Sequence, residues 1–190
     1  MITVVSGLPR SGTSLMMQML AAGGMPVLTD GERQADADNP RGYYEWERVK
    51  LLPKQPDCIE EAEGKTVKVI SQLLFALPAG RDYRIIFMQR PLPEVVASQA
   101  EMIRRRGTTG APLPPAALIA GLAAHLNQVN AWLKGKANLS VHRVEHQDVL
   151  REPLRTSESI QQFLKCPLDV VAMSQQIDTS LYRQRAPSTV

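Results

Sequence analysis

The residues best suited to chemistry lie near the start of the chain, in a loop with two glycines, a cation and several hydroxyls. The loop runs from Gly7 to Ser14 and has the sequence GLPRSGTS. Glycines let the main chain turn tightly, so that successive N–H groups can point at one anion. The guanidinium of Arg10 adds positive charge, and the hydroxyls of Ser11, Thr13 and Ser14 can donate hydrogen bonds. This stretch predicts a phosphate-binding loop.

The flanking residues predict the elements that hold this loop. Residues 2–5 are Ile-Thr-Val-Val, a β-branched run typical of a buried strand. After the loop, Leu15, Met16, Met19 and Leu20 recur at helical spacing. A helix that begins at the loop adds the positive end of its dipole to the site. An ordinary strand–turn–helix without a ligand is the alternative.

The loop differs at one position from the nucleoside-triphosphate pattern G-x-x-x-x-G-K-[ST]. Thr13 stands where that pattern has its lysine, and Arg10 is the cation inside the loop instead. Nucleotide kinases and GTPases use that lysine on the outer phosphates. The substitution therefore counts against a P-loop phosphotransferase that uses ATP and Mg²⁺, which we keep as an alternative.

The loop resembles the 5′-phosphosulfate loop of sulfotransferases that use 3′-phosphoadenosine 5′-phosphosulfate (PAPS). Arg90 and Ser98, eight positions apart, match the Arg and Ser that this family uses on the 3′-phosphate of the donor. The resemblance runs from Ile2 to about Leu168 and is most specific in these two places. It implies a single domain over residues 1–190 with a three-layer α/β/α architecture. A mainly parallel sheet of the P-loop nucleotide-kinase type would form its centre.

The resemblance also implies which residues contact the donor. His146 falls where the family has a tyrosine near the adenine, and Arg183 lies in a basic tail that matches a late 3′-phosphate loop. The expected contacts to PAPS, or to the product adenosine 3′,5′-bisphosphate (PAP), are Pro9, Arg10, Ser11, Gly12, Thr13, Ser14, Arg90, Ser98, His146 and Arg183. No metal is expected.

Catalysis needs a base, because transfer of a sulfuryl group to an alcohol requires removal of the hydroxyl proton. Residues 39–45 are similar to a stretch of bacterial sulfotransferase-like proteins that carries an acidic residue, so Glu45 is the first candidate and Glu47 the second. Lys68 matches a lysine at the end of a family strand, but the family histidine would fall at Ile70. We therefore expect Glu45 as the base. Arg10 and Lys68 would stabilise the leaving phosphate, unless Lys68 merely extends its ammonium from a strand end.

Composition limits the class of partner. The chain has 190 residues, a net charge of +3 and 44% hydrophobic residues, which suits one soluble domain with an anionic small ligand. We expect a small-molecule or glycan acceptor, no nucleic acid and no membrane, because no apolar run approaches ~20 residues. No secretory signal is evident, and Cys58 and Cys166 suggest reduced thiols of a cytoplasmic protein. A non-catalytic PAP-binding module is a further alternative, and a homodimer is one of the open oligomeric states.

The rest of the pattern predicts alternating strands and helices. Strands are expected at 25–28, 66–70, 84–90 and 138–144. Helices are expected at 91–106, 114–133 and 169–177, with a further helix containing Ile160, Phe163 and Leu164 and short helices before 52 and within 53–64. The polar segment 29–41 predicts a surface loop that could cover a substrate.

Overall fold

Five parallel strands form one sheet in the part of the chain that this computed structural model describes, residues 1–36, 39–105, 107, 113–178 and 180. Their order across the sheet is β2-β3-β1-β4-β5. The strands are β1 (Ile2–Gly7), β2 (Val27–Leu28), β3 (Thr66–Lys68), β4 (Tyr83–Gln89) and β5 (Leu139–Glu145). Because all strands run the same way, their carboxyl ends meet at one edge, where open α/β sheets bind ligands.

Alternation along the central strands builds two separate cores. Val4 pairs with Ile85 and faces one side of the sheet, whereas Val5 pairs with Ile86 and faces the other. All four side chains are fully buried. Burial on both faces explains why the sequence of these strands is apolar without a polar alternation.

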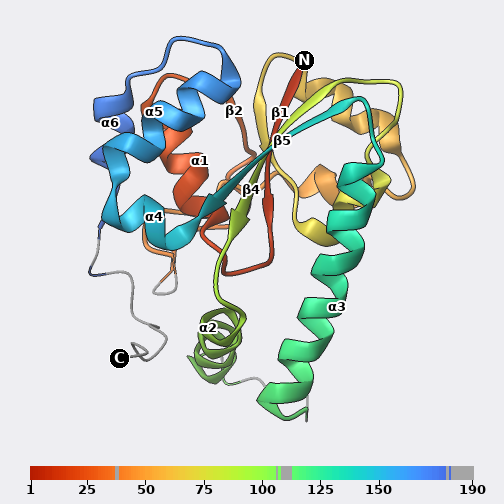
Figure 1. Cartoon of the computed structure of the whole chain (residues 1–190), viewed down its shortest axis with the longest axis vertical. Coiled ribbons are helices and arrows are strands. Elements are labelled where there is room, and N and C mark those ends of the chain that lie inside the picture. The colour runs from red at the N-terminus through yellow and green to blue at the C-terminus, as the bar shows by residue number, and fades with distance from the viewer. Residues whose placement is uncertain (37–38, 106, 108–112, 179, 181–190) are drawn as a thin grey trace.

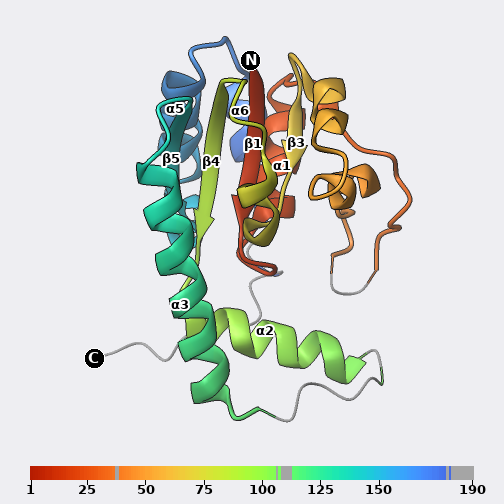
Figure 2. The same cartoon turned by 90° about the vertical axis from the view of Figure 1, so that its right-hand side faces the viewer.

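Helices cover both faces, as Figure 1 shows. One face carries α1 (Thr13–Ala22), α4 (His146–Arg151), α5 (Pro153–Leu164) and α6 (Val170–Ser174). The other carries α3 (Pro115–Lys134) and the 3₁₀ helices η1 (Glu47–Leu51), η2 (Pro56–Ala62) and η3 (Ser71–Ala76). The remaining helix, α2 (Leu92–Arg105), lies beyond the carboxyl ends of the strands and crosses their direction (Figure 2).

The predicted three-layer α/β architecture with a parallel sheet is confirmed. Three expected elements are shorter than the sequence predicted. The strand expected at 66–70 ends at Lys68, since Ile70 caps η3, and the strand expected at 25–28 is limited to Val27–Leu28. The helix expected at 169–177 is limited to Val170–Ser174. The short helices expected before 52 and within 53–64 are 3₁₀ turns rather than α-helices. Arg183 lies outside the described residues, so its expected role is not addressed by the structure.

Within the described residues, no helix combines the length and the apolar character that a membrane crossing requires.

Candidate active site

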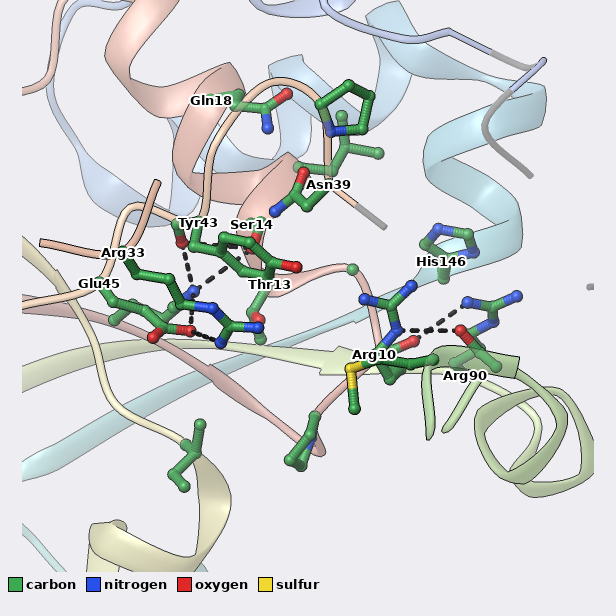
Figure 3. Close-up of a pocket in the computed structure, with 18 of the residues that line it drawn as sticks. Arg10, Thr13, Ser14, Gln18, Arg33, Asn39, Tyr43, Glu45, Arg90 and His146 are labelled. Carbon is green, nitrogen blue, oxygen red and sulfur yellow. Dashed lines mark hydrogen bonds and ion pairs between the residues drawn. The ribbon is translucent and has the colours of Figure 1, made fainter. Parts of the chain in front are cut away.

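A cavity of about 450 Å³ opens at the carboxyl edge of the sheet. This volume is within the range of pockets that hold small molecules. The cavity is lined by nearly all of the described residues that the sequence singled out: Pro9, Arg10, Gly12, Thr13, Ser14, Glu45, Lys68, Arg90, Ser98 and His146. In Figure 3, Glu45 lies at one end of the close-up, Arg10, Arg90 and His146 at the other, and Ser14 between them.

The loop between β1 and α1 leaves the first amides of the helix available to a ligand. Gly12 is the N-cap of α1, adopts a left-handed conformation at φ 99°, and has no side chain that could cap the helix. The N–H groups of the first turn have no partner inside an α-helix, so an anion can accept from them. In the loop before the helix, the N–H of Ser11 is already used, since it donates to the Leu8 carbonyl at 3.1 Å.

Ser11 differs from the other predicted loop contacts. Its side chain is 1% exposed and does not line the cavity. Its Oγ is packed so close to Gly7 that a Cβ at residue 7 would lie 2.5 Å from it. Among the described residues this buried hydroxyl has no hydrogen-bond partner. Its contact to PAPS stays a prediction.

Arg10 is held in a conformation that few residues with a side chain adopt. Its φ is 72°, in the left-handed region, and such strain is often found at functional sites. Its Nε donates to Ser98 Oγ at 3.0 Å, and its carbonyl accepts from Arg90 Nη1 at 3.0 Å. Arg10, the predicted contact to the 5′-phosphosulfate, therefore touches both residues that are predicted to bind the 3′-phosphate, Arg90 and Ser98.

A buried carboxylate that sequence reasoning missed supports Arg90. Glu94, with a side chain 1% exposed, accepts from Arg90 Nε at 2.9 Å. Gln147 donates to the other oxygen of the same carboxylate at 3.3 Å. Arg90 lies between β4 and α2 and Glu94 in the first turn of α2, so the pair forms where the chain turns from the strand into the helix.

His146 packs directly against the loop between β1 and α1. A Cβ at Gly12 would lie 2.6 Å from His146 Cδ2, so the imidazole needs a glycine at this position. Burial lowers the pKa of His146 to about 4, and the positive charge of Arg90 contributes to the decrease. The ring is therefore neutral near pH 7. Whether it lies near an adenine stays a prediction.

Lys68 is a buried cation between the loop and Glu45. It is 5% exposed, and its Nζ contacts Ser14 Oγ at 3.3 Å, Glu45 Oε1 at 3.3 Å and the Tyr43 carbonyl. Burial lowers the pKa of Lys68 to about 8, while the carboxylate of Glu45 opposes the decrease. The ammonium is therefore protonated at neutral pH and close to its titration point.

Arg33, which the sequence did not single out, completes this end of the site. Its Nη1 donates to Glu45 Oε1 at 2.8 Å, and its guanidinium lies 3.4 Å from the centre of the Tyr43 ring. The Tyr43 hydroxyl donates in turn to the carboxylate of Asp36. Arg33 belongs to a loop without periodicity, so no sequence signal could have found it.

The second candidate base lies at the mouth of the cavity. Glu47 lines the cavity but forms an ion pair with Lys50, and the Glu47 side chain is 39% exposed. Glu45 is 23% exposed and touches Lys68 directly. Both contacts to Glu45 described above involve Oε1, and no described residue hydrogen-bonds to Oε2.

Two solved sulfotransferase structures are similar to this chain. The sulfotransferase domain from the curacin biosynthetic pathway has 16% identity and a TM-score of 0.53, with 93% of this chain and 77% of that chain covered. Sulfotransferase STF1 from Mycobacterium tuberculosis H37Rv has 17% identity and a TM-score of 0.56, with 95% of this chain and 73% of that chain covered. No protein-family model and no curated protein sequence matches the chain. At this identity the likeness is one of fold, and the chain has the α/β fold of these sulfotransferases.

Proposed function

We propose that the protein is a sulfotransferase that moves a sulfuryl group from PAPS to a hydroxyl or amine acceptor. The observation that carries the proposal is the position of Lys68. Its ammonium contacts both Ser14 of the anion loop and Glu45, the candidate base. A cation at this position would contact both the phosphosulfate end of the donor and the carboxylate that accepts the proton. The fold shared with two sulfotransferases supports the same reaction.

The order of side chains along the sheet edge suits the two ends of such a donor. The loop follows β1 in the centre of the sheet, and Arg90 follows β4 at its side. Uncapped amides of α1 and the guanidinium of Arg10 would bind the phosphosulfate. Arg90 and Ser98, both at the edge of the same cavity, would bind the 3′-phosphate.

Glu45 would take the proton of the acceptor on Oε2 while Arg33 and Lys68 hold Oε1 in place. The acceptor oxygen forms a bond to sulfur, and the bond between sulfur and the bridging oxygen of the phosphate breaks. The leaving PAP keeps the electron pair of that bond. Lys68 and Arg10 would neutralise the charge that develops on the bridging oxygen.

Calorimetry with PAP and with ADP tests the donor without knowledge of the acceptor. We expect PAP to bind at least tenfold more tightly, because ADP lacks the 3′-phosphate that Arg90 and Ser98 would recognise. Sulfuryl transfer should persist in EDTA. Binding of ATP with Mg²⁺ but not of PAP would overturn the proposal in favour of a phosphotransferase, and PAP binding without transfer to any acceptor would indicate a non-catalytic module.

The base assignment has its own test. We expect Glu45→Gln to lower kcat by ~10²–10⁴-fold, the range for a lost general base, with the Kd of PAP unchanged. Glu47→Gln changes a carboxylate of the same cavity that is paired with Lys50 and does not touch Lys68. If Glu47→Gln lost turnover and Glu45→Gln kept it, Glu47 would be the base.

A further inference from the structure

A buried pair of opposite charges lies beside the cavity, where the chain passes from β4 to α2. Arg90 lines the cavity, whereas Glu94, in the first turn of α2, does not. The Arg90 and Glu94 side chains are 8% and 1% exposed, and Arg90 Nε donates to Glu94 Oε2 at 2.9 Å. Because Glu94 is not at the cavity surface, it can act on a bound molecule only through Arg90.

Hydrogen bonds continue from this pair on both sides. Arg90 Nη1 donates to the Arg10 carbonyl at 3.0 Å, and Figure 3 shows this contact between the two arginines. Gln147 Nε2 donates to Glu94 Oε1 at 3.3 Å, so the two carboxylate oxygens have different partners. The four residues join α4, α2, the end of β4 and the loop between β1 and α1.

The pairing fixes the guanidinium of Arg90 before any ligand arrives. A buried charge is costly unless it has a partner, and Glu94 provides that partner. The guanidinium is held at two nitrogen atoms, at Nε by Glu94 and at Nη1 by the carbonyl of Arg10. A side chain held in this way loses little further conformational freedom when it binds a phosphate, so the phosphate is bound more tightly.

Gln147 has the chemistry that its contact with Glu94 requires. A neutral amide can donate a hydrogen bond to a carboxylate, whereas a second carboxylate at this position would repel the first. Gln147 also follows His146, whose ring packs against Gly12. The bond to Glu94 therefore connects the start of α4, and with it His146, to α2.

We propose that Glu94 is a positioning residue for the nucleotide donor: it holds Arg90 in the orientation that binds the 3′-phosphate, and Gln147 holds Glu94. This inference rests on the proposed sulfotransferase function and adds two residues outside the cavity to its donor site. Loss of the Glu94 charge should therefore weaken binding of a nucleotide with a 3′-phosphate far more than binding of one without it.

Calorimetry with PAP and ADP measures this effect as the ratio of the Kd of ADP to the Kd of PAP, which should be at least about ten in the wild type. We expect Glu94→Gln to lower this ratio about tenfold, the effect of losing one charge-assisted hydrogen bond. Gln147→Glu should lower it as well, because the new carboxylate repels Glu94. A variant that is merely less well folded loses affinity for both nucleotides together, and its ratio stays at the wild-type value.

The double variant Glu94→Gln/Gln147→Glu exchanges the two side chains. Its amide at position 94 can accept from Arg90 and donate to the carboxylate at position 147, so the hydrogen bonds and the net charge of the network are kept. We expect the ratio to return to within about threefold of the wild-type value. If Glu94→Gln does not fold, Gln147→Glu and the double variant provide the same test.

Glu152→Gln is the matched control, because it removes a carboxylate that pairs with Arg155 at the surface and does not line the cavity. The Glu152 side chain is 45% exposed, and its loss should leave the ratio unchanged. A wild-type ratio in a folded Glu94→Gln variant, or a double variant whose ratio is no higher than that of Gln147→Glu, would overturn the inference.

The failure of this inference can be distinguished from the failure of the proposed function. If the wild type binds PAP no more tightly than ADP, the 3′-phosphate site is refuted, and the proposed function and this inference fail together. If the wild type prefers PAP as expected and Glu94→Gln keeps that preference, the role of Glu94 alone is refuted and the proposed function stands.

Discussion

Replacing Lys68 by methionine should make the folded protein more stable at neutral pH while abolishing sulfuryl transfer. The reason is that a charged ammonium is buried at this position, where only 5% of the residue is exposed. Methionine has an unbranched side chain of similar length and carries no charge. The substitution therefore removes the charge that the site needs and the desolvation penalty that the fold bears.

The size of the effect follows from the pKa of Lys68, which burial lowers from 10.5 to about 8. Since one pKa unit corresponds to about 1.4 kcal/mol, the buried charge costs the folded state on the order of 3 kcal/mol. The partners of Lys68 stay satisfied without it. The Tyr43 carbonyl still accepts from Ser14 Oγ at 3.3 Å, and Glu45 keeps its bond to Arg33. We expect Lys68→Met to raise the free energy of unfolding by ~1–3 kcal/mol at pH 7.

The gain should depend on pH in a defined direction. Between pH 8 and 10.5 the unfolded chain binds more protons at Lys68 than the folded protein does, so wild-type stability rises with pH relative to the variant. The free-energy penalty of burying the charged Lys68 is present in full below about pH 8, the pKa of Lys68 in the folded protein. It is lost as the pH rises towards 10.5, the pKa in the unfolded chain. About 2 kcal/mol of the difference between variant and wild type should be gone at pH 9.5.

Urea unfolding followed by circular dichroism between pH 7 and 9.5 measures this difference directly. Lys65→Met is the matched control, because Lys65 is exposed just before β3 and should give no gain that depends on pH. A Lys68→Met variant less stable than wild type at pH 7, or a gain that stays constant up to pH 9.5, would refute the reasoning. Full transfer activity in a folded variant would refute the catalytic role of the ammonium.

Three further predictions concern residues around the loop. Arg33→Met should move the alkaline decrease of kcat to higher pH, because the positive charge of Arg33 contributes to the lowered pKa of Lys68, and a pH–rate profile checks it. His146→Gln should weaken the loss of stability at acid pH. The pKa of His146 is lowered from 6.5 to about 4, so the free energy of unfolding of the wild type falls by up to ~3 kcal/mol as the pH drops through this range. Urea unfolding at pH 4 to 7 measures this. Gly12→Ala should lower stability by ~1–3 kcal/mol and abolish PAP binding in calorimetry, because alanine is strained at φ 99° and its Cβ would lie 2.6 Å from His146. An unshifted alkaline limb, an unchanged acid limb or normal PAP binding, respectively, would contradict them.

The opposite effects expected for Lys68 on stability and on activity illustrate a common cost of function. In the proposed reaction the charge of Lys68 acts on the donor, and its withdrawal from water makes the fold less stable. The strained φ of Arg10 and of Tyr44, which precedes Glu45, points in the same direction. Both residues belong to the segments that meet at the cavity.

Local patterns were sufficient to predict the strand–loop–helix around Gly7 to Ser14. The β-branched run, the glycines and the helical spacing all act within a few residues, so each can be recognised without the rest of the chain. The Arg90–Glu94 pair is close in sequence, but Arg90 precedes α2, so the pair depends on the turn between β4 and α2. Lys68 stood out because a lysine in a buried strand must have partners, but the sequence did not identify those partners.

The sequence alone determined the strand–loop–helix at the start of the chain and a layered α/β domain around it, because main-chain conformation and strand burial depend on short-range patterns. The tertiary structure decided which distant side chains share the cavity. Arg10 and Ser98 are 88 positions apart, and Lys68 and Glu45 are 23 apart, yet each pair is in contact. The strand order brings them together, since β3, β1 and β4 are neighbours whose carboxyl ends meet at one edge. Arg33 reaches the same cavity from a loop whose path only packing specifies, and its contact with Glu45 could not be read from the sequence.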